Sequence, residues 1–479
     1  MSKSEGKRVL SNFLYNLLYQ IVKMILPLIT IPYVSRVLGA ENLGIFNYVF
    51  SVAIYFEMIA YLGFDNHGSR LIAQKKNDLE GLNKAFTGAY CFQLISCIIA
   101  IVLYIAFMTF FCEHYRLVAW IQIIYISAEI FNINWLYFGL ENFKKTALIN
   151  TLVRIAAFAA VLIFVKDRSD LPVYTVICAA SPLVSTLLLW PGTCRHVRFV
   201  KVNAKDIWDY GKGAIVLFFP VLVINIYRTM DKIMLGHIAS MTEVAFYANA
   251  DKIVEIPFGV ITALGVVMIP RMTSFISSGQ YEKSLKYIEL SMRFMIFLAC
   301  AMSFGMMGIA KVFAPVFFGE EFAASGILIM IIAPMIIIRA CADVIRTQYL
   351  LPNKRDKDYI ISITIGVFIN LSLNLILIPK LMSVGAAIAT LFAESFVALY
   401  QILVCRRDIP VVRYVVRNWY FPLAGAAMFV PVYLYGQLNE ATVTTLVMQI
   451  AIGTILYLII TGIYLYKEEK PIIQRLLKK

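Results

Sequence analysis

The chain alternates between long apolar runs and short polar connections. A helix that crosses a bilayer needs roughly 20 consecutive apolar residues, and each run is close to that length. The runs lie at residues 10–34, 44–64, 85–111, 117–138, 146–165, 171–190, 211–236, 244–269, 288–313, 326–346, 359–378, 385–404, 419–435 and 442–466. The sequence therefore predicts an all-α, polytopic membrane protein with about 14 transmembrane helices.

The amino-acid composition also favours a membrane protein over a soluble one. Of the 479 residues, 61% are hydrophobic and 15% are charged, whereas soluble domains carry about 25% charged residues. The net charge of +14 comes from basic residues in short connections between apolar runs, which argues against nucleic acid as a partner. The partner that this composition indicates is the lipid bilayer, and we expect no soluble catalytic domain.

The basic residues also predict the orientation of the chain. One set of alternate connections holds most of the Lys and Arg residues, and cytoplasmic loops carry this excess. The other set contains only Arg36, Arg116, Lys166, Arg168, Lys311 and Lys380. We therefore expect a multi-pass protein of a bacterial cytoplasmic membrane with both termini in the cytoplasm.

A weak internal repeat suggests two lobes. The segment from Arg36 to Asn47 resembles the segment from Ile233 to Asn249. This offset spans six helices, as in transporters built from repeated halves. The predicted organisation is an N-terminal six-helix lobe at residues 1–190, a cytoplasmic linker at 191–210, a C-terminal six-helix lobe at 211–404, and two extra helices with a cytoplasmic tail at 405–479.

Several motifs carry a family resemblance. The most specific are Asn134-Trp-Leu-Tyr-Phe-Gly-Leu-Glu141 and the block from Asp231 to Tyr247, and others are Arg36 to Gly44, Gly63-Phe64, Arg70 to Ala73, Ala250 to Ile253 and Pro270-Arg271. Together they resemble the polysaccharide transporter, or repeat-unit flippase, family of the multidrug/oligosaccharidyl-lipid/polysaccharide exporter superfamily. Most of these residues lie at helix ends and turns, so we expect them to be structural rather than to contact substrate.

The resemblance implies a transporter, not an enzyme. Members move polyprenyl-pyrophosphate-linked oligosaccharides or teichoic-acid precursors from the inner to the outer leaflet by alternating access between two lobes. A lipid-linked glycan would then be the substrate of this chain. Neither the sugar nor the lipid carrier follows from the sequence, and the oligomeric state and the type of cell envelope stay open.

Polar side chains inside the apolar runs are the candidates for function, because a charge at mid-bilayer costs roughly 2.5–3.5 kcal/mol unless it faces protein or water. Basic side chains suit a pyrophosphate group. The candidates for a cationic substrate-binding cavity are Lys23, Arg228, Lys232, Lys252 and Arg339, with the amides of Asn16, Gln20 and Asn225. The alternative is that these cations pair with nearby carboxylates and only hold helices together.

Acidic side chains in the runs have two interpretations. They are proton or cation coupling sites, or they are members of structural ion pairs. The candidates are Glu57, Glu129, Asp231, Asp251, Glu255, Asp343 and Glu394. The sequence indicates no catalytic residue, metal site or cofactor, and it leaves open whether protons or sodium ions drive transport.

Two other functions remain in competition. A cation-coupled multidrug exporter of the same superfamily would favour a cavity dominated by carboxylates, whereas basic residues are at least as prominent here. A glycan polymerase or ligase would be an enzyme with an ordered acceptor site on a long outer loop, and the predicted outer connections, such as residues 35–43 and 436–441, are short.

Overall fold

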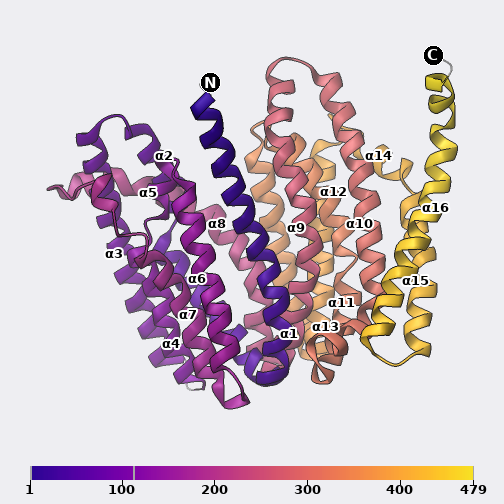
Figure 1. Cartoon of the computed structure of the whole chain (residues 1–479), viewed down its shortest axis with the longest axis horizontal. Coiled ribbons are helices and arrows are strands. Elements are labelled where there is room, and N and C mark those ends of the chain that lie inside the picture. The colour runs from indigo at the N-terminus through magenta and orange to yellow at the C-terminus, as the bar shows by residue number, and fades with distance from the viewer. Residues whose placement is uncertain (1–2, 112–113, 478–479) are drawn as a thin grey trace. The chain divides into compact units, whose positions relative to one another are not determined.

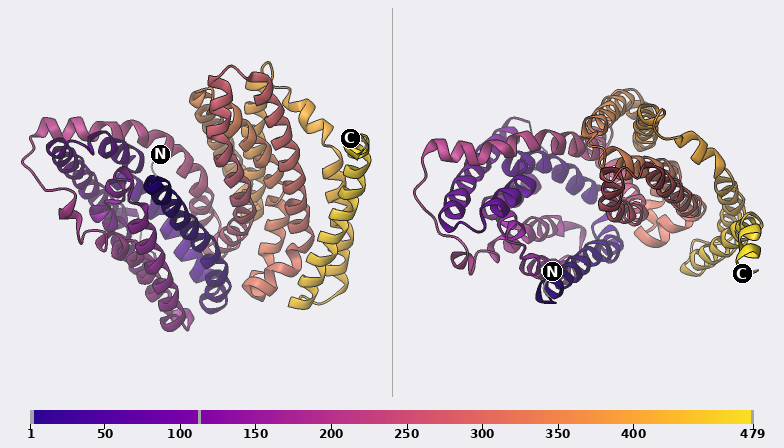
Figure 2. Two further views of the ribbon diagram at one scale, coloured as in Figure 1. Left: turned by 45° about the horizontal axis from the view of Figure 1, so that its top comes forward. Right: turned by 90° about the horizontal axis from the view of Figure 1, so that it is seen from above.

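The computed structural model describes the backbone of residues 3–111 and 114–477, and the side chains of residue 22 and residues 25–110 and 114–466. All regular structure in these ranges is helical. The chain forms two compact units. The first runs to Gly236 and includes Ser240–Ala245, and the second comprises His237–Ala239 and the chain from Phe246 onward. Within each unit the long helices run side by side (Figure 1, Figure 2).

The first unit combines long helices with short helical pieces near their ends. Its elements are α1 (Lys3–Tyr61), α2 (Phe64–Lys75), α3 (Leu79–Phe111), α4 (Arg116–Ser127), the 3₁₀ turn η1 (Ala128–Phe131), α5 (Asn134–Gly139), α6 (Phe143–Phe164), η2 (Arg168–Asp170), α7 (Leu171–Leu187), η3 (Thr193–Arg195) and α8 (Ala204–Ile238). The three pieces α4, η1 and α5 form one broken span.

The second unit is built from longer helices. Its elements are α9 (Met241–Ser277), α10 (Tyr281–Phe318), η4 (Glu320–Phe322), α11 (Ala323–Ile332), α12 (Met335–Ile345), the π-helical turn η5 (Arg346–Leu350), α13 (Asp356–Cys405), α14 (Val411–Arg417), α15 (Tyr420–Leu438) and α16 (Val443–Leu477). α11 and α12 are bent by 45° relative to each other and together are long enough for one span.

The predicted all-α membrane architecture is confirmed. Eleven described helices are long and apolar enough to cross a membrane, or up to 12 if the bent pair counts as one span. Two of them, α1 and α13, each join two helices across a kink, at Gly39 (φ 77°) and at Met382 (φ 51°). Both kinks fall in connections that the hydropathy pattern predicts, so dividing these helices brings the count close to the prediction of about 14.

The lobe boundaries remain a prediction. Predicted linker residues 204–210 belong to the beginning of α8, which is one continuous helix to Ile238. By spatial proximity α8 belongs to the first unit. The two segments of the proposed repeat each contain a sharp break, at Gly39 and between α8 and α9.

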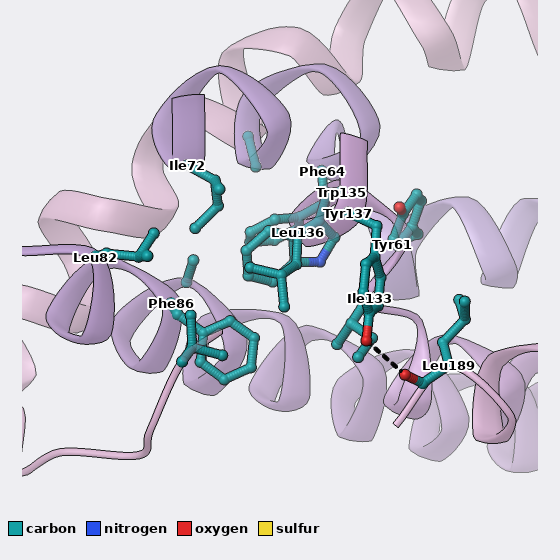
Figure 3. Close-up of a cluster of buried hydrophobic side chains, with 13 residues drawn as sticks. Tyr61, Phe64, Ile72, Leu82, Phe86, Ile133, Trp135, Leu136, Tyr137 and Leu189 are labelled. Carbon is teal, nitrogen blue, oxygen red and sulfur yellow. Dashed lines mark hydrogen bonds between the residues drawn. The ribbon is translucent and has the colours of Figure 1, made fainter. Parts of the chain in front are cut away.

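An apolar cluster lies where the short helices α2 and α5 meet α3 in the first unit (Figure 3). Phe64 and Ile72 of α2, Phe86 of α3, and Trp135 and Leu136 of α5 are each fully buried. Their burial is the main stabilising term that fixes α2 and α5, since helices of such length are marginal on their own.

Candidate functional site

A partly buried ion-pair triad joins three helices of the second unit. Arg339 of α12 donates through Nη1 to the Oε1 atom of Glu255 on α9, and its Nη2 lies 2.7 Å from the Oε1 atom of Glu394 on α13. The Arg339 side chain is 14% exposed, compared with 35% for Glu255 and 8% for Glu394. Phe258 follows Glu255 by one turn on α9, and its ring centroid lies 5.3 Å from the guanidinium carbon of Arg339. We call Glu255, Arg339 and Glu394 the triad.

The triad gives Arg339 the paired role that was one of its two predicted interpretations. Glu394 likewise has the ion pair that was one of its two predicted interpretations, since it is bonded to Arg339. The sequence shows that Arg339 lies inside an apolar run, but not which side chains of other helices it meets. In the triad, the single guanidinium of Arg339 binds two carboxylates.

A second ion pair lies further along the same span. Arg346 donates to Asp343 Oδ1 and, through Nη1, to the Tyr359 hydroxyl at 3.2 Å. The other carboxylate oxygen of Asp343 is buried against Gly265 of α9, where a side chain would collide with it. Asp343 is thus an ion-pair member in this structure. Its span contacts α9 at Gly265 and α13 at Tyr359.

The candidate cavity residues of α8 differ in their surroundings. Arg228 is exposed and, among the side chains that the structure describes, takes part in no hydrogen bond or ion pair. Asn225 Nδ2 donates to the carbonyl of Val221 at 3.0 Å, so this amide is turned toward its own helix. Lys232 is half-buried and Asp231 is buried.

The remaining predicted cations and amides belong to α1 and α9. Asp251 and Lys252 are half-buried neighbours at the beginning of α9. Asn16, Gln20 and Lys23 belong to the first half of α1, and their side chains lie outside the described residues. Their assignment to a cavity stays a prediction.

The carboxyl group of Glu129 lies at the break in the α4–η1–α5 span. It is 6% exposed and accepts a hydrogen bond from Asn132 Nδ2 at 2.7 Å. Glu57 of α1 is half-buried and lies within electrostatic reach of Glu129. Neither carboxylate has an ion pair among the described residues, in contrast to Glu255 and Glu394.

Gln93 of α3 is a residue that sequence reasoning missed. It is fully buried, its Nε2 donates to the backbone oxygens of Glu129 (2.6 Å) and Asn132 (2.9 Å), and its Oε1 accepts from Trp135 Nε1 at 2.8 Å. These bonds give the two peptide oxygens at the break a side-chain donor, and the Glu129 oxygen also accepts from the Asn132 N–H at 3.3 Å. An amide in the middle of the apolar run 85–111 was the available signal.

The most specific motif is explained by packing. Trp135 lies against Gly68 of α2, where an added Cβ would come within 2.8 Å of the indole ring, and Gly139 lies against Ile72 in the same way at 2.6 Å. The Tyr137 hydroxyl donates to the Leu189 carbonyl at 2.7 Å (Figure 3). These contacts give the motif residues a structural role in docking α5 onto α2.

The glycines of the repeat-like segments have a similar role. Gly44 lies so close to the Met241 carbonyl that a side chain would collide with it, and Gly236 lies in the same way against the Tyr48 ring. Helix backbones can approach this closely only where the side chain is minimal. Gly44 and Gly236 therefore permit tight packing between α1 and the α8–α9 turn.

The fold defines the class of protein. It is similar to the solved structure of the lipid II flippase MurJ in an inward closed conformation, with a TM-score of 0.78 and 16% identity over 94% of this chain and 99% of that one. An inward-facing multidrug resistance MATE transporter of the MOP superfamily gives a TM-score of 0.61 and 14% identity over 82% of this chain and 95% of that one. The chain is thus a multi-pass membrane protein with the fold of this transporter superfamily.

The family follows from the sequence itself. The profile of the polysaccharide biosynthesis protein family matches residues 9–276, and the chain belongs to this family. A relative from Escherichia coli (strain K12), the "Putative O-antigen transporter", is 24% identical over 402 residues, which cover 83% of this chain and 96% of the relative. The resemblance predicted from the motifs is confirmed.

Proposed function

We propose that the protein is a flippase that moves a polyprenyl-pyrophosphate-linked oligosaccharide, or a teichoic-acid precursor, from the inner to the outer leaflet by alternating access. The observation that carries this proposal is the match over 96% of the length of a relative named as an O-antigen transporter. Both termini would lie in the cytoplasm, and no covalent chemistry is involved.

The charges in the spans support an anionic substrate. Arg228 is exposed on α8 within an apolar span. A cation at mid-bilayer costs roughly 2.5–3.5 kcal/mol unless it meets water or an anion. We therefore assign Arg228 to a hydrated passage that accepts the pyrophosphate, together with Lys23, Lys232 and Lys252. The polyprenyl tail would stay in the bilayer during transport.

The multidrug exporter is the main alternative, and the triad disfavours it. An organic cation requires carboxylates that are free to bind it, and Glu255 and Glu394 of the second unit are both bonded to Arg339. This alternative would have to act through Glu57 and Glu129 of the first unit, which have no ion pair among the described residues. Drug resistance conferred by expression of the protein, without any effect on lipid-linked sugars, would support this alternative.

The direct test is transport in proteoliposomes. The probe is a fluorescent undecaprenyl-pyrophosphate-linked disaccharide, and a membrane-impermeant reductant reports the fraction in the outer leaflet. We expect the purified protein to raise the rate of probe movement above that of empty vesicles. Rates equal to those of empty vesicles, with correctly folded protein, would contradict the proposal.

Loss of the proposed cavity charges provides the first prediction. Arg228→Ala and Lys23→Ala should each lower surface glycan by about tenfold in a cell that depends on this protein, because each removes a charge-assisted contact to phosphate. Surface glycan is measured together with protein level. Lys84→Ala is the control, since this exposed lysine is bonded to Glu80 at 2.8 Å on the same helix. Normal glycan in Arg228→Ala at a normal protein level would remove Arg228 from the cavity.

A further inference from the structure

The two carboxylates of the triad are not equivalent. Both bind the guanidinium of Arg339, but Glu255 is 35% exposed and Glu394 is 8% exposed. A more exposed ion pair gains less from the low dielectric and is more easily exchanged. Glu255 is therefore the partner that Arg339 can release at the lower cost, whereas Glu394 keeps the guanidinium in place.

A carboxylate and a phosphate compete for the same guanidinium. Arg presents a planar set of N–H donors that matches the oxygens of either anion. In the triad the Nη1 donor is occupied by Glu255. An anion that reaches this donor must displace Glu255, and the binding energy is then reduced by the energy of the pair that is lost.

We propose, on the basis of the proposed function, that Glu255 is an internal competitor that occupies on Arg339 the position taken by a substrate phosphate during transport. Binding of the phosphate breaks the contact between α9 and α12 that Glu255 makes and leaves the contact between α12 and α13 that Glu394 makes. The substrate thus favours a state in which the Glu255–Arg339 ion pair no longer joins α9 to α12. A ligand shifts a conformational equilibrium through this kind of differential contact.

Phe258 stabilises the guanidinium in both states. Its ring lies 5.3 Å from the guanidinium carbon, and a cation over an aromatic face is attracted to it. Arg339 therefore keeps its contacts to Phe258 and Glu394 when Glu255 leaves. These contacts keep the Arg339 guanidinium in place while its Nη1 donor exchanges Glu255 for the substrate phosphate.

Affinity for undecaprenyl pyrophosphate tests the exchange. Protein in detergent micelles is titrated with this lipid, and the dissociation constant is measured by thermophoresis. Glu255→Gln should bind about tenfold more tightly than the wild-type protein, because the competing charge is removed and its partial exposure limits the gain. Glu255→Asp, whose carboxylate reaches less far, should give a smaller gain. The double variant Glu255→Gln with Arg339→Gln should lose the gain.

Two control variants separate exchange from general charge effects. Glu394→Gln should not tighten binding, since Glu394 fixes Arg339 and does not compete. Glu289→Gln should leave the affinity unchanged, because Glu289 pairs with Arg417 outside the triad, at 2.7 Å. Size-exclusion profiles confirm that each variant is folded before titration.

The outcomes distinguish this inference from the function on which it rests. If the wild-type protein binds the lipid and Glu255→Gln binds no more tightly, the inference is overturned and the proposed function stands. If Glu394→Gln tightens binding as much as Glu255→Gln, the exchange is also overturned, because the effect is then only a change of net charge. If neither wild type nor variants bind the lipid, both proposals are overturned.

Discussion

At the scale of single residues, buried polar side chains in this protein hold irregular backbone together. Gln93 satisfies two peptide oxygens of the broken span and accepts from the indole of Trp135. Its partners lie 36 to 42 residues further along the chain, so the sequence shows a polar residue in an apolar run but not its contacts. The same limit applies to Arg339: its place inside an apolar run was predictable, and its pairing with both Glu255 and Glu394 was not.

Gln93→Leu provides a prediction at this scale. The variant removes the Gln93 bonds to the Trp135 indole N–H and to the peptide oxygens of Glu129 and Asn132. The Glu129 oxygen keeps the Asn132 N–H at 3.3 Å, and each group left unsatisfied costs about 1–3 kcal/mol. We expect a clear fall in the temperature at which the detergent-solubilised protein loses its monodisperse size-exclusion peak. Lys84→Ala on the same helix should have little effect, since it removes an exposed pair. Equal melting of Gln93→Leu and wild type would contradict this role.

At the scale of elements, hydropathy predicts the long helices but not the short ones. The spans are set by runs of apolar residues, and their observed bounds agree with the predicted ones to within a few residues in most cases. The short helices α2 and α14 lie between the predicted runs, and hydropathy does not reveal that the run at 117–138 is divided into α4, η1 and α5. α2 and α5 are stabilised by tertiary contacts, which the sequence pattern does not reveal.

Gly68→Ala tests the docking of α2 onto α5. The new methyl group would lie 2.8 Å from the Trp135 ring, so the two helices must separate slightly. Overpacking of this kind costs about 1–3 kcal/mol, and we expect a lower melting temperature. Gly259→Ala is the matched control, because a Cβ at Gly259 meets nothing within 4 Å and alanine favours a helix over glycine by up to about 1 kcal/mol. A Gly68→Ala variant as stable as Gly259→Ala would show that the packing between Gly68 and Trp135 tolerates an added methyl group.

At the scale of the whole molecule, the sequence predicts best the features that follow from spanning a lipid bilayer. The approximate number of spans was predictable because burial in a bilayer requires long apolar helices with internally satisfied backbones. The superfamily was predictable from motifs such as residues 134–141 and 231–247. The candidate site was predictable only in part. The cations could be named, but the lobe boundaries and the role of each cation depend on distant contacts and stay predictions.

The orientation of the chain is a prediction for the whole molecule. The basic connections predict that both termini are cytoplasmic. A fluorescent protein fused after Lys479 should therefore fluoresce, and alkaline phosphatase inserted between Gly436 and Ala441 should be active outside the cytoplasm. Inactive phosphatase at this position, in a stable fusion, would reverse the predicted topology.

The break in the α4–η1–α5 span has a consequence for biosynthesis. Peptide oxygens in the break accept hydrogen bonds from residues made much later, at 3.3 Å from the Thr186 hydroxyl to Ala128 and at 2.9 Å from the Trp190 indole to Phe131. A nascent chain that ends before these residues has neither donor. Ribosome-bound chains stalled in α6 should thus expose this region to protease, and chains extended beyond α7 should protect it.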